Sequence, residues 1–229
     1  IIQAALEGKD TLALLPTGGG KSVCFQIPSL MQDGICIVIS PLISLMKDQV
    51  EHLKSKGIKS VAITSGMCKD EVDVALGNCI YGNYKFLYLS PERLQNKMVQ
   101  ERIRQMNVNL ITVDEAHCIS EWGYDFRPSY LHIAEIREVI PNTPILALTA
   151  TATSDIIDDI QEKLLFQQKH LLQSSFVREN LSYVVINTED KKNKLVKIIK
   201  HFKSSAIVYV GSRKETKGIT QLLRNNNIS

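Results

Sequence analysis

Short runs of apolar and β-branched residues alternate along the chain with longer amphipathic segments. The runs predict strands at Thr11–Leu15, Ile35–Ser40, Ser60–Thr64, Phe86–Ser90, Leu110–Val113 and Pro144–Thr149. Several of these runs are continuous, which is typical of strands that are covered on both faces. Strands that alternate with helices predict an α/β fold, a parallel sheet flanked by helices with right-handed crossovers.

The clearest predicted helix spans Leu42–Lys56. Its apolar residues recur at spacings of three and four, which places them on one face of an α-helix. Gln49 is the one polar residue on that face. Gly57 follows directly, and glycine commonly ends a helix.

The alternation restarts after about Leu172. Strands are predicted at Leu181–Asn187 and Ala206–Val210, and helices at Lys191–Phe202 and Arg213–Arg224. These elements are too few for an independent α/β domain. We therefore expect one domain over residues 1–172 and the truncated start of a second over residues 173–229. The chain opens at Ile1 without a methionine, and we expect it to begin inside a helix.

Composition narrows the possibilities only slightly. Apolar residues make up 44% of the chain and charged residues 22%, which is ordinary for a globular protein. A net charge of +3 permits a nucleic-acid partner without requiring one. The five cysteines are scattered, with no CxxC pair, so we expect a reducing compartment (a bacterial cytosol or nucleoid) with neither disulfides nor a zinc site. No apolar run is long enough to span a membrane.

A candidate phosphate-binding loop follows the first predicted strand. Leu15–Ser22 lies between that strand and a helix-compatible run, Lys21–Leu30, which is the context that such a loop requires. Glycines let backbone N–H groups turn toward phosphate oxygens, and a helix N-terminus adds positive partial charge. The residues expected to hold the nucleotide are Thr17, Gly18, Gly19, Gly20, Lys21 and Ser22. Leu15 stands where the general pattern has glycine, so a glycine-rich turn without a ligand is the alternative.

Two carboxylates follow the fifth predicted strand, Leu110–Val113. Ligands of open α/β sheets bind beyond the carboxyl ends of the strands. Asp114 is therefore expected to share a Mg²⁺ ion with Ser22, opposite the phosphate contact of Lys21. Glu115 is expected to orient or deprotonate the attacking water, and His117 to sense the γ-phosphate. The alternative is an ordinary acidic turn after a strand.

The segment Asp114–Pro128, with the sequence DEAHCISEWGYDFRP, closely resembles the RecQ DNA helicases of helicase superfamily 2. Further segments match this family in the same order: Thr17–Ser22, Ser40–Gln49, Leu89–Leu94, Leu148–Thr153, Ser175–Leu181 and Ile207–Lys214. In the family, a large apolar residue is usual at the position of Leu15. The resemblance implies two RecA-like lobes that bind ATP and Mg²⁺. It also implies 3′-to-5′ movement along single-stranded DNA and unwinding of forked duplexes in recombination or repair, by a protein that we expect to be a monomer.

The resemblance also assigns residues to DNA contact and to its coupling with ATP hydrolysis. These residues are Ser40, Ser90, Arg93, His117, Trp122, Phe126, Arg127, Thr149 and Thr151. Aromatic faces stack on bases without strong sequence preference, and arginine pairs with phosphate. Packing of the aromatic side chains against the core and loop capping by Ser40, Ser90 and Arg93 are the alternatives. Tyr124 departs from the histidine that is frequent at its position in the family, which leaves the coupling step open.

Two parts of the family's ATP site are expected outside this sequence. They are a glutamine that binds adenine, upstream of residue 1, and an arginine finger beyond Ser229, so we expect the chain alone to hydrolyse ATP slowly. Two other functions stay open. One is a nucleic-acid-stimulated ATPase or translocase that does not unwind DNA, and the other is a non-enzymatic nucleic-acid-binding module. Intact Lys21, Asp114 and Glu115 argue against the module, and the Trp122 loop argues against an RNA substrate.

Overall fold

A computed structural model describes residues 1–123, 125–175, 180–202 and 204–228. The chain forms two compact units, Ile1–Val177 and Arg178–Ser229, which are described separately. Tyr124, noted above for its departure from the family, lies outside the described residues. So do residues 176–179 of the segment Ser175–Leu181.

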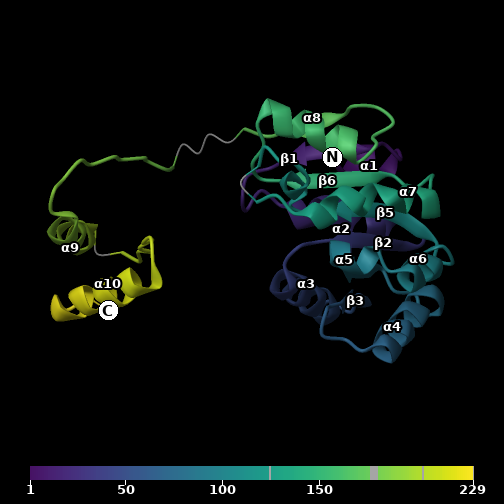
Figure 1. The fold of residues 1–229 in the computed structure, drawn as a ribbon, viewed down its shortest axis with the longest axis horizontal. Coiled ribbons are helices and arrows are strands. Elements are labelled where there is room, and N and C mark those ends of the chain that lie inside the picture. The colour runs from purple at the N-terminus through teal and green to yellow at the C-terminus, as the bar shows by residue number, and fades with distance from the viewer. Residues whose placement is uncertain (124, 176–179, 203, 229) are drawn as a thin grey trace. The chain divides into compact units, whose positions relative to one another are not determined.

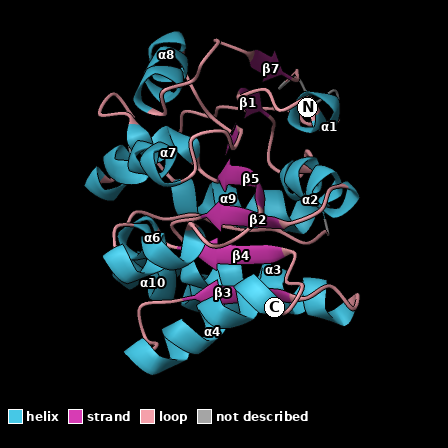
Figure 2. Cartoon of the chain, turned by 90° about the vertical axis from the view of Figure 1, so that its right-hand side faces the viewer, coloured by secondary structure: helices cyan, strands magenta, loops and turns pink. Residues whose placement is uncertain are grey.

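The first unit is built on one seven-stranded sheet in the order β3-β4-β2-β5-β6-β1-β7 (Figure 2). The strands are β1 Thr11–Leu14, β2 Ile35–Ile39, β3 Ser60–Ile63, β4 Phe86–Leu89, β5 Val108–Val113, β6 Ile145–Thr149 and β7 Leu171–Gln173. Every pairing in the sheet is parallel. The predicted parallel α/β fold is therefore confirmed, and all six predicted strands are present.

Helices surround this sheet in the first unit (Figure 1). The α-helices are α1 Ile2–Leu6, α2 Lys21–Met31, α3 Ile43–Ser55, α4 Lys69–Tyr81, α5 Pro91–Leu94, α6 Lys97–Ile103, α7 Ile136–Val139 and α8 Ser154–Lys163; the 3₁₀ helices are η1 Ala116–Ile119 and η2 Pro128–Glu135. The predicted helix Leu42–Lys56 corresponds to α3, and the predicted helix Lys21–Leu30 to α2.

Alternate residues of the strands enter two separate hydrophobic cores. In β2, Ile37 and Ile39 belong to one core, whereas Cys36 and Val38 belong to the other. The first core includes buried residues of α4, α6 and α8, and the second includes buried residues of α1, α2 and α3. Strands β1, β2, β4 and β6 are buried throughout. Because both faces of these strands are covered, they are almost continuously apolar in sequence.

Strand β7 has no counterpart among the predicted strands. It extends the sheet at β1, with Leu12 paired to Leu171 and Leu14 to Gln173. The strand is only three residues long and none of its residues is buried, so its two leucines are too few to form a recognisable apolar run. The expected domain border at residue 172 lies inside this strand.

The second unit contains α9 Lys191–Phe202 and α10 Arg213–Asn225, which match the two predicted helices. The two predicted strands are wrong, because residues 181–187 and 206–210 have no strand structure. Most of their side chains are exposed, with Val185 98% and Tyr209 89% accessible. A strand needs a hydrogen-bonded neighbour and a covered face, and the described part of this unit supplies neither. Among the described residues of the whole chain, no helix is long and apolar enough to cross a membrane.

Candidate nucleotide-binding site

Four neighbouring strands carry the predicted site at one edge of the sheet. Strands β2, β5, β6 and β1 are adjacent and parallel, so their carboxyl ends meet at the same edge. Ser40 follows β2, Asp114 follows β5, Thr149 ends β6, and the loop Leu15–Gly20 follows β1. The fold thus brings together residues that are far apart in the sequence, at the edge where open α/β sheets bind ligands.

The glycine loop after β1 has a backbone shape that other residues do not fit. Gly18 and Gly20 have φ angles of 79° and 78°, a conformation that side chains rarely allow. A Cβ atom on Gly19 would lie 2.8 Å from the carbonyl oxygen of Pro16. Helix α2 begins directly after the loop, and its first turn has no acidic residue. An anion can therefore approach the free N–H groups at the helix N-terminus without repulsion from a carboxylate.

Asp114 is a buried carboxylate whose position is fixed by its neighbours. The Glu115 N–H donates to Asp114 Oδ1 at 3.0 Å, and the Tyr130 hydroxyl donates to the Asp114 carbonyl oxygen at 3.0 Å. Burial raises the pKa of Asp114 to about 6; the Glu115 charge adds to this rise and the Lys21 charge opposes it. A divalent cation beside this carboxylate would offset its lost hydration. Carboxylate and hydroxyl oxygens are suitable ligands for Mg²⁺, so Asp114 and Ser22 suit the predicted ion chemically.

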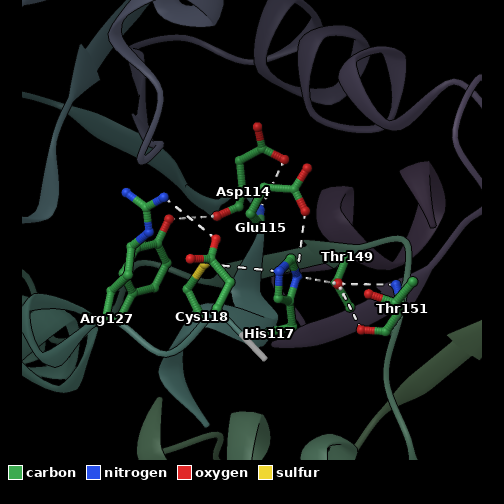
Figure 3. A network of polar contacts seen from close by, with 9 residues as sticks. Asp114, Glu115, His117, Cys118, Arg127, Thr149 and Thr151 are labelled. Atoms are coloured by element: carbon green, nitrogen blue, oxygen red, sulfur yellow. Dashed lines mark hydrogen bonds and ion pairs between the residues drawn. The ribbon is translucent and has the colours of Figure 1, made fainter. Parts of the chain in front are cut away.

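His117 links Glu115 to the end of the next strand (Figure 3). Its Nδ1 lies 2.9 Å from Thr149 Oγ1 and 3.4 Å from Glu115 Oε2. The Thr149 hydroxyl donates to the carbonyl oxygen of Thr151 at 3.1 Å, so its single proton is already engaged. Thr149 Oγ1 must then accept from His117, which places the imidazole proton on Nδ1. The link therefore runs from Glu115 through His117 and Thr149 to Thr151.

The loop after η1 presents an aromatic side chain to solvent. Trp122 is 77% exposed, so packing against the core does not explain it, whereas Phe126 is half-buried. Arg127 is held by protein groups. It donates to the Pro41 carbonyl oxygen at 3.5 Å and to Asp125 Oδ2 at 3.4 Å. The loop is thereby connected to the segment that follows β2.

Ser90 and Arg93 have clear structural roles. The Ser90 hydroxyl accepts from the Arg93 N–H at the start of α5. The Arg93 guanidinium donates to the carbonyl oxygens of Thr64 and Met67, at 2.8 and 3.1 Å. These contacts support the capping alternative for both residues. Ser40 is buried at the end of β2.

The sequence did not identify Asp159 and Lys163 as parts of this region. Asp159 Oδ2 accepts from the Ser120 hydroxyl at 2.7 Å and from Lys163 Nζ at 3.2 Å. Lys163 Nζ also donates to the Ile119 carbonyl oxygen at 3.3 Å, and Ser120 Oγ accepts from the Trp122 N–H. Both residues belong to α8, and the four-residue spacing of their opposite charges was the one available signal.

The chain is similar in sequence to known helicases. The chain is 43% identical over 222 residues to the ATP-dependent DNA helicase RecQ of Bacillus subtilis, covering 96% of this chain and 38% of the relative. It is 42% identical to a protein of Acanthamoeba polyphaga mimivirus that is named as an ATP-dependent RNA helicase, covering 97% of this chain and 41% of that protein. The predicted resemblance to RecQ helicases is thus confirmed, although the chain spans less than half the length of the curated relatives that it matches.

The fold is also that of a solved helicase structure. The DUF1998 helicase MrfA superposes with a TM-score of 0.70 at 16% identity, covering 99% of this chain and 37% of that one. The model of the DEAD/DEAH box helicase family matches residues 1–160, which include the glycine loop, the Asp114–His117 segment and Thr149. The chain belongs to the DEAD/DEAH box helicase family.

Proposed function

We propose that this chain is the ATP-binding part of an ATP-driven DNA helicase that moves along single-stranded DNA and unwinds forked duplexes. The observation that carries the proposal is the connection from Glu115 through His117 to Thr149, at the strand ends beside the glycine loop. Glu115 is placed beside the nucleotide in this proposal, and it contacts the end of β6 through His117. A change in the bound nucleotide can therefore shift His117 and, through it, the loop that follows β6. The B. subtilis relative, named as a DNA helicase, supports the same choice.

On the nucleotide side, the glycine loop encloses the phosphates of ATP. Thr17 and Gly18–Gly20 supply backbone N–H groups, and Lys21 neutralises the β- and γ-phosphates. Ser22 and Asp114 would hold Mg²⁺, and the ion would supply positive charge beside the transferred phosphoryl group. Glu115 orients the attacking water and accepts its proton.

On the DNA side, the exposed indole of Trp122 stacks on bases. Phe126 supports that loop, and Arg127 joins it to Pro41, the residue that follows Ser40. Movement is 3′ to 5′, in DNA recombination or repair, by a monomer located with DNA in a reducing compartment. Residues 1–172 form the first RecA-like domain, and residues 173–229 start the second.

RNA is the competing substrate, because a mimivirus relative of equal similarity is named as an RNA helicase. The exposed Trp122 stacks on either nucleic acid and does not separate the two. The Lys191–Phe202 helix has a basic face, which we interpret as solvated surface. The choice between DNA and RNA therefore needs a direct comparison.

The test compares unwinding of forked DNA and forked RNA by the full-length protein, together with two variants. Lys21→Ala is expected to lose ATP binding and unwinding. Glu115→Gln is expected to bind ATP with near-normal affinity but to hydrolyse it at least 100-fold more slowly. Preferred unwinding of RNA would transfer the proposal to RNA, and near-normal turnover by Glu115→Gln would remove the role of Glu115.

A further inference from the structure

Three metal-ligating side chains meet where the Asp114–His117 segment leads into the loop between η1 and η2, here called the aromatic loop, which carries Trp122 and Phe126. His117, Cys118 and Asp125 each offer a ligand atom, and these atoms all lie within 4.8 Å of one another. Cys118 Sγ lies 3.9 Å from His117 Nε2 and 3.6 Å from Asp125 Oδ2. The sequence alone gave no zinc pattern, because two of these residues are adjacent in the chain and no CxxC pair is present.

The two separations from the cysteine sulfur suit a tetrahedral zinc ion. Zinc lies about 2.3 Å from a thiolate sulfur and about 2.0–2.2 Å from an imidazole nitrogen or a carboxylate oxygen. Tetrahedral angles then put the ligand atoms about 3.5 Å apart. The two distances from Cys118 Sγ need to close by only a few tenths of an ångström. The ligand atoms of His117 and Asp125 lie within 4.8 Å of each other and have to approach further when a metal binds.

The histidine ring is already oriented for such a role. Its proton is on Nδ1, which donates to Thr149 Oγ1 at 2.9 Å and faces Glu115 at 3.4 Å. In the neutral ring the lone pair is therefore on Nε2, the atom that faces Cys118 Sγ. Metal-bound histidines typically donate their other N–H to a carboxylate or another oxygen acceptor, which fixes the tautomer.

We propose that His117 Nε2, Cys118 Sγ and Asp125 Oδ2 form a binding site for a thiophilic divalent cation of the Zn²⁺ class. Nitrogen and sulfur ligands favour zinc over Mg²⁺, so this site differs from the oxygen site of Asp114 and Ser22. A fourth position is left for water. Burial raises the pKa of the Cys118 thiol to about 12, so the thiol proton must pass to solvent when the metal binds.

A bound cation would hold the aromatic loop against the catalytic segment. Asp125 also pairs with Arg127, which contacts the Pro41 carbonyl oxygen, so the metal would compete for this carboxylate. We expect a bound Zn²⁺ ion to lower DNA-stimulated ATP hydrolysis, an expectation that rests on the proposed function. The binding site itself does not depend on that function.

Cobalt titration of the 229-residue chain tests the site, because Co²⁺ substitutes for Zn²⁺ and gives a thiolate charge-transfer band. One Co²⁺ per chain is expected to produce this band, and Zn²⁺ in equal amount to remove it. Excess Mg²⁺ should leave the band unchanged. Absence of the band, or its displacement by Mg²⁺, overturns the proposal without bearing on the proposed helicase function.

Three variants locate the ligands. Cys118→Ser is expected to abolish the band, and Asp125→Asn to weaken Co²⁺ binding at least tenfold. Cys68→Ser, at an exposed cysteine, is the matched control and should bind like the wild type. A band that survives in Cys118→Ser, or unchanged binding by Asp125→Asn, sinks the three-ligand site. Asp125 is exposed, so its variant decides the question even if Cys118→Ser fails to fold.

Discussion

His117 and Thr149 join the ends of neighbouring strands β5 and β6 through a hydrogen bond of 2.9 Å. Both side chains are buried. Burial strengthens such a contact and makes an unpaired partner costly. The position of His117 therefore depends on Thr149, the last residue of β6. Because His117 also lies beside Glu115, the environment of Glu115 depends on Thr149 as well.

Thr149→Val keeps the shape of the side chain and removes the hydroxyl that accepts from His117. The loss of one buried hydrogen bond costs about 1–3 kcal/mol. We expect stimulation of ATP hydrolysis by single-stranded DNA to fall about tenfold. Thr149→Ser keeps the hydroxyl and should retain most of the stimulation. Equal stimulation in Thr149→Val and the wild type would show that the hydrogen bond serves only packing.

Asp114→Asn is expected to weaken the binding of Mg²⁺-ATP and to stabilise the folded protein. The pKa of Asp114 is raised from 3.8 to about 6, so the charged form is unfavourable in the folded protein. The contribution of Asp114 to the free energy of unfolding is therefore most favourable below about pH 4, where the carboxyl is neutral. This contribution is lost as the pH rises through about 6 and the carboxyl ionises. Removal of the charge should therefore raise the free energy of unfolding at pH 7 by about 1–3 kcal/mol.

Urea unfolding of Asp114→Asn and the wild type without Mg²⁺ measures this difference. The gain should shrink as the pH falls from 7 to 4, because the wild-type carboxyl becomes neutral. Binding of Mg²⁺-ATP should weaken in the same variant. No difference in stability at pH 7 would contradict the assignment of a buried, unfavourable charge.

Trp122→Ala tests the exposed indole. Because the side chain is 77% exposed, its loss should change the free energy of unfolding by less than about 0.5 kcal/mol. Stacking on a base contributes about 1–3 kcal/mol, so the affinity for single-stranded DNA should fall at least fivefold. Fluorescence anisotropy with a labelled oligonucleotide measures it, and Trp122→Phe should retain part of the binding. Unchanged affinity would exclude a stacking role.

Most of the sheet was predictable because both of its faces are buried, so its strands are unbroken apolar runs such as Ile35–Ile39. The same signal misled at Leu181–Asn187 and Ala206–Val210. An apolar run indicates that a segment can form a strand if another strand pairs with it and other residues cover its face. The run does not indicate whether such a neighbouring strand is present. Strand β7 shows the converse, because pairing with β1 creates a strand from three residues that are too few to form an apolar run.

The position of site residues at the strand ends was predictable, because motif residues such as Asp114 come directly after buried apolar runs. The residues that hold the aromatic loop in place were not predictable from the sequence. Asp159 contacts Ser120 only because α8 packs beside η1, and Asp125 contacts Cys118 although seven residues separate them in the chain. Tertiary packing decides both contacts, so no local pattern predicts them.

The buried carboxylate of Asp10 offers the sharpest stability test outside the site. Asp10 Oδ2 accepts from Arg137 at 2.7 Å and from the Gln167 N–H at 3.0 Å, and Oδ1 accepts from the Ile145 N–H at 2.8 Å. The carboxylate thus joins the start of β6 to the segments before β1 and after α8. Asp10→Ala would leave a nearly buried guanidinium and two N–H groups without their acceptor.

Loss of one partner of a buried ion pair costs about 3–5 kcal/mol, so Asp10→Ala should lower the free energy of unfolding by that amount. Asp158→Ala is the matched control. It removes the ion pair with Lys169, which is equally short at 2.6 Å but whose side chains are 64% and 63% exposed. An exposed pair contributes less than about 1 kcal/mol. Urea unfolding of both variants measures the change in the free energy of unfolding and so separates the effect of burial from that of a short distance. Equal changes in the two variants would show that burial of the Asp10 ion pair adds no stability.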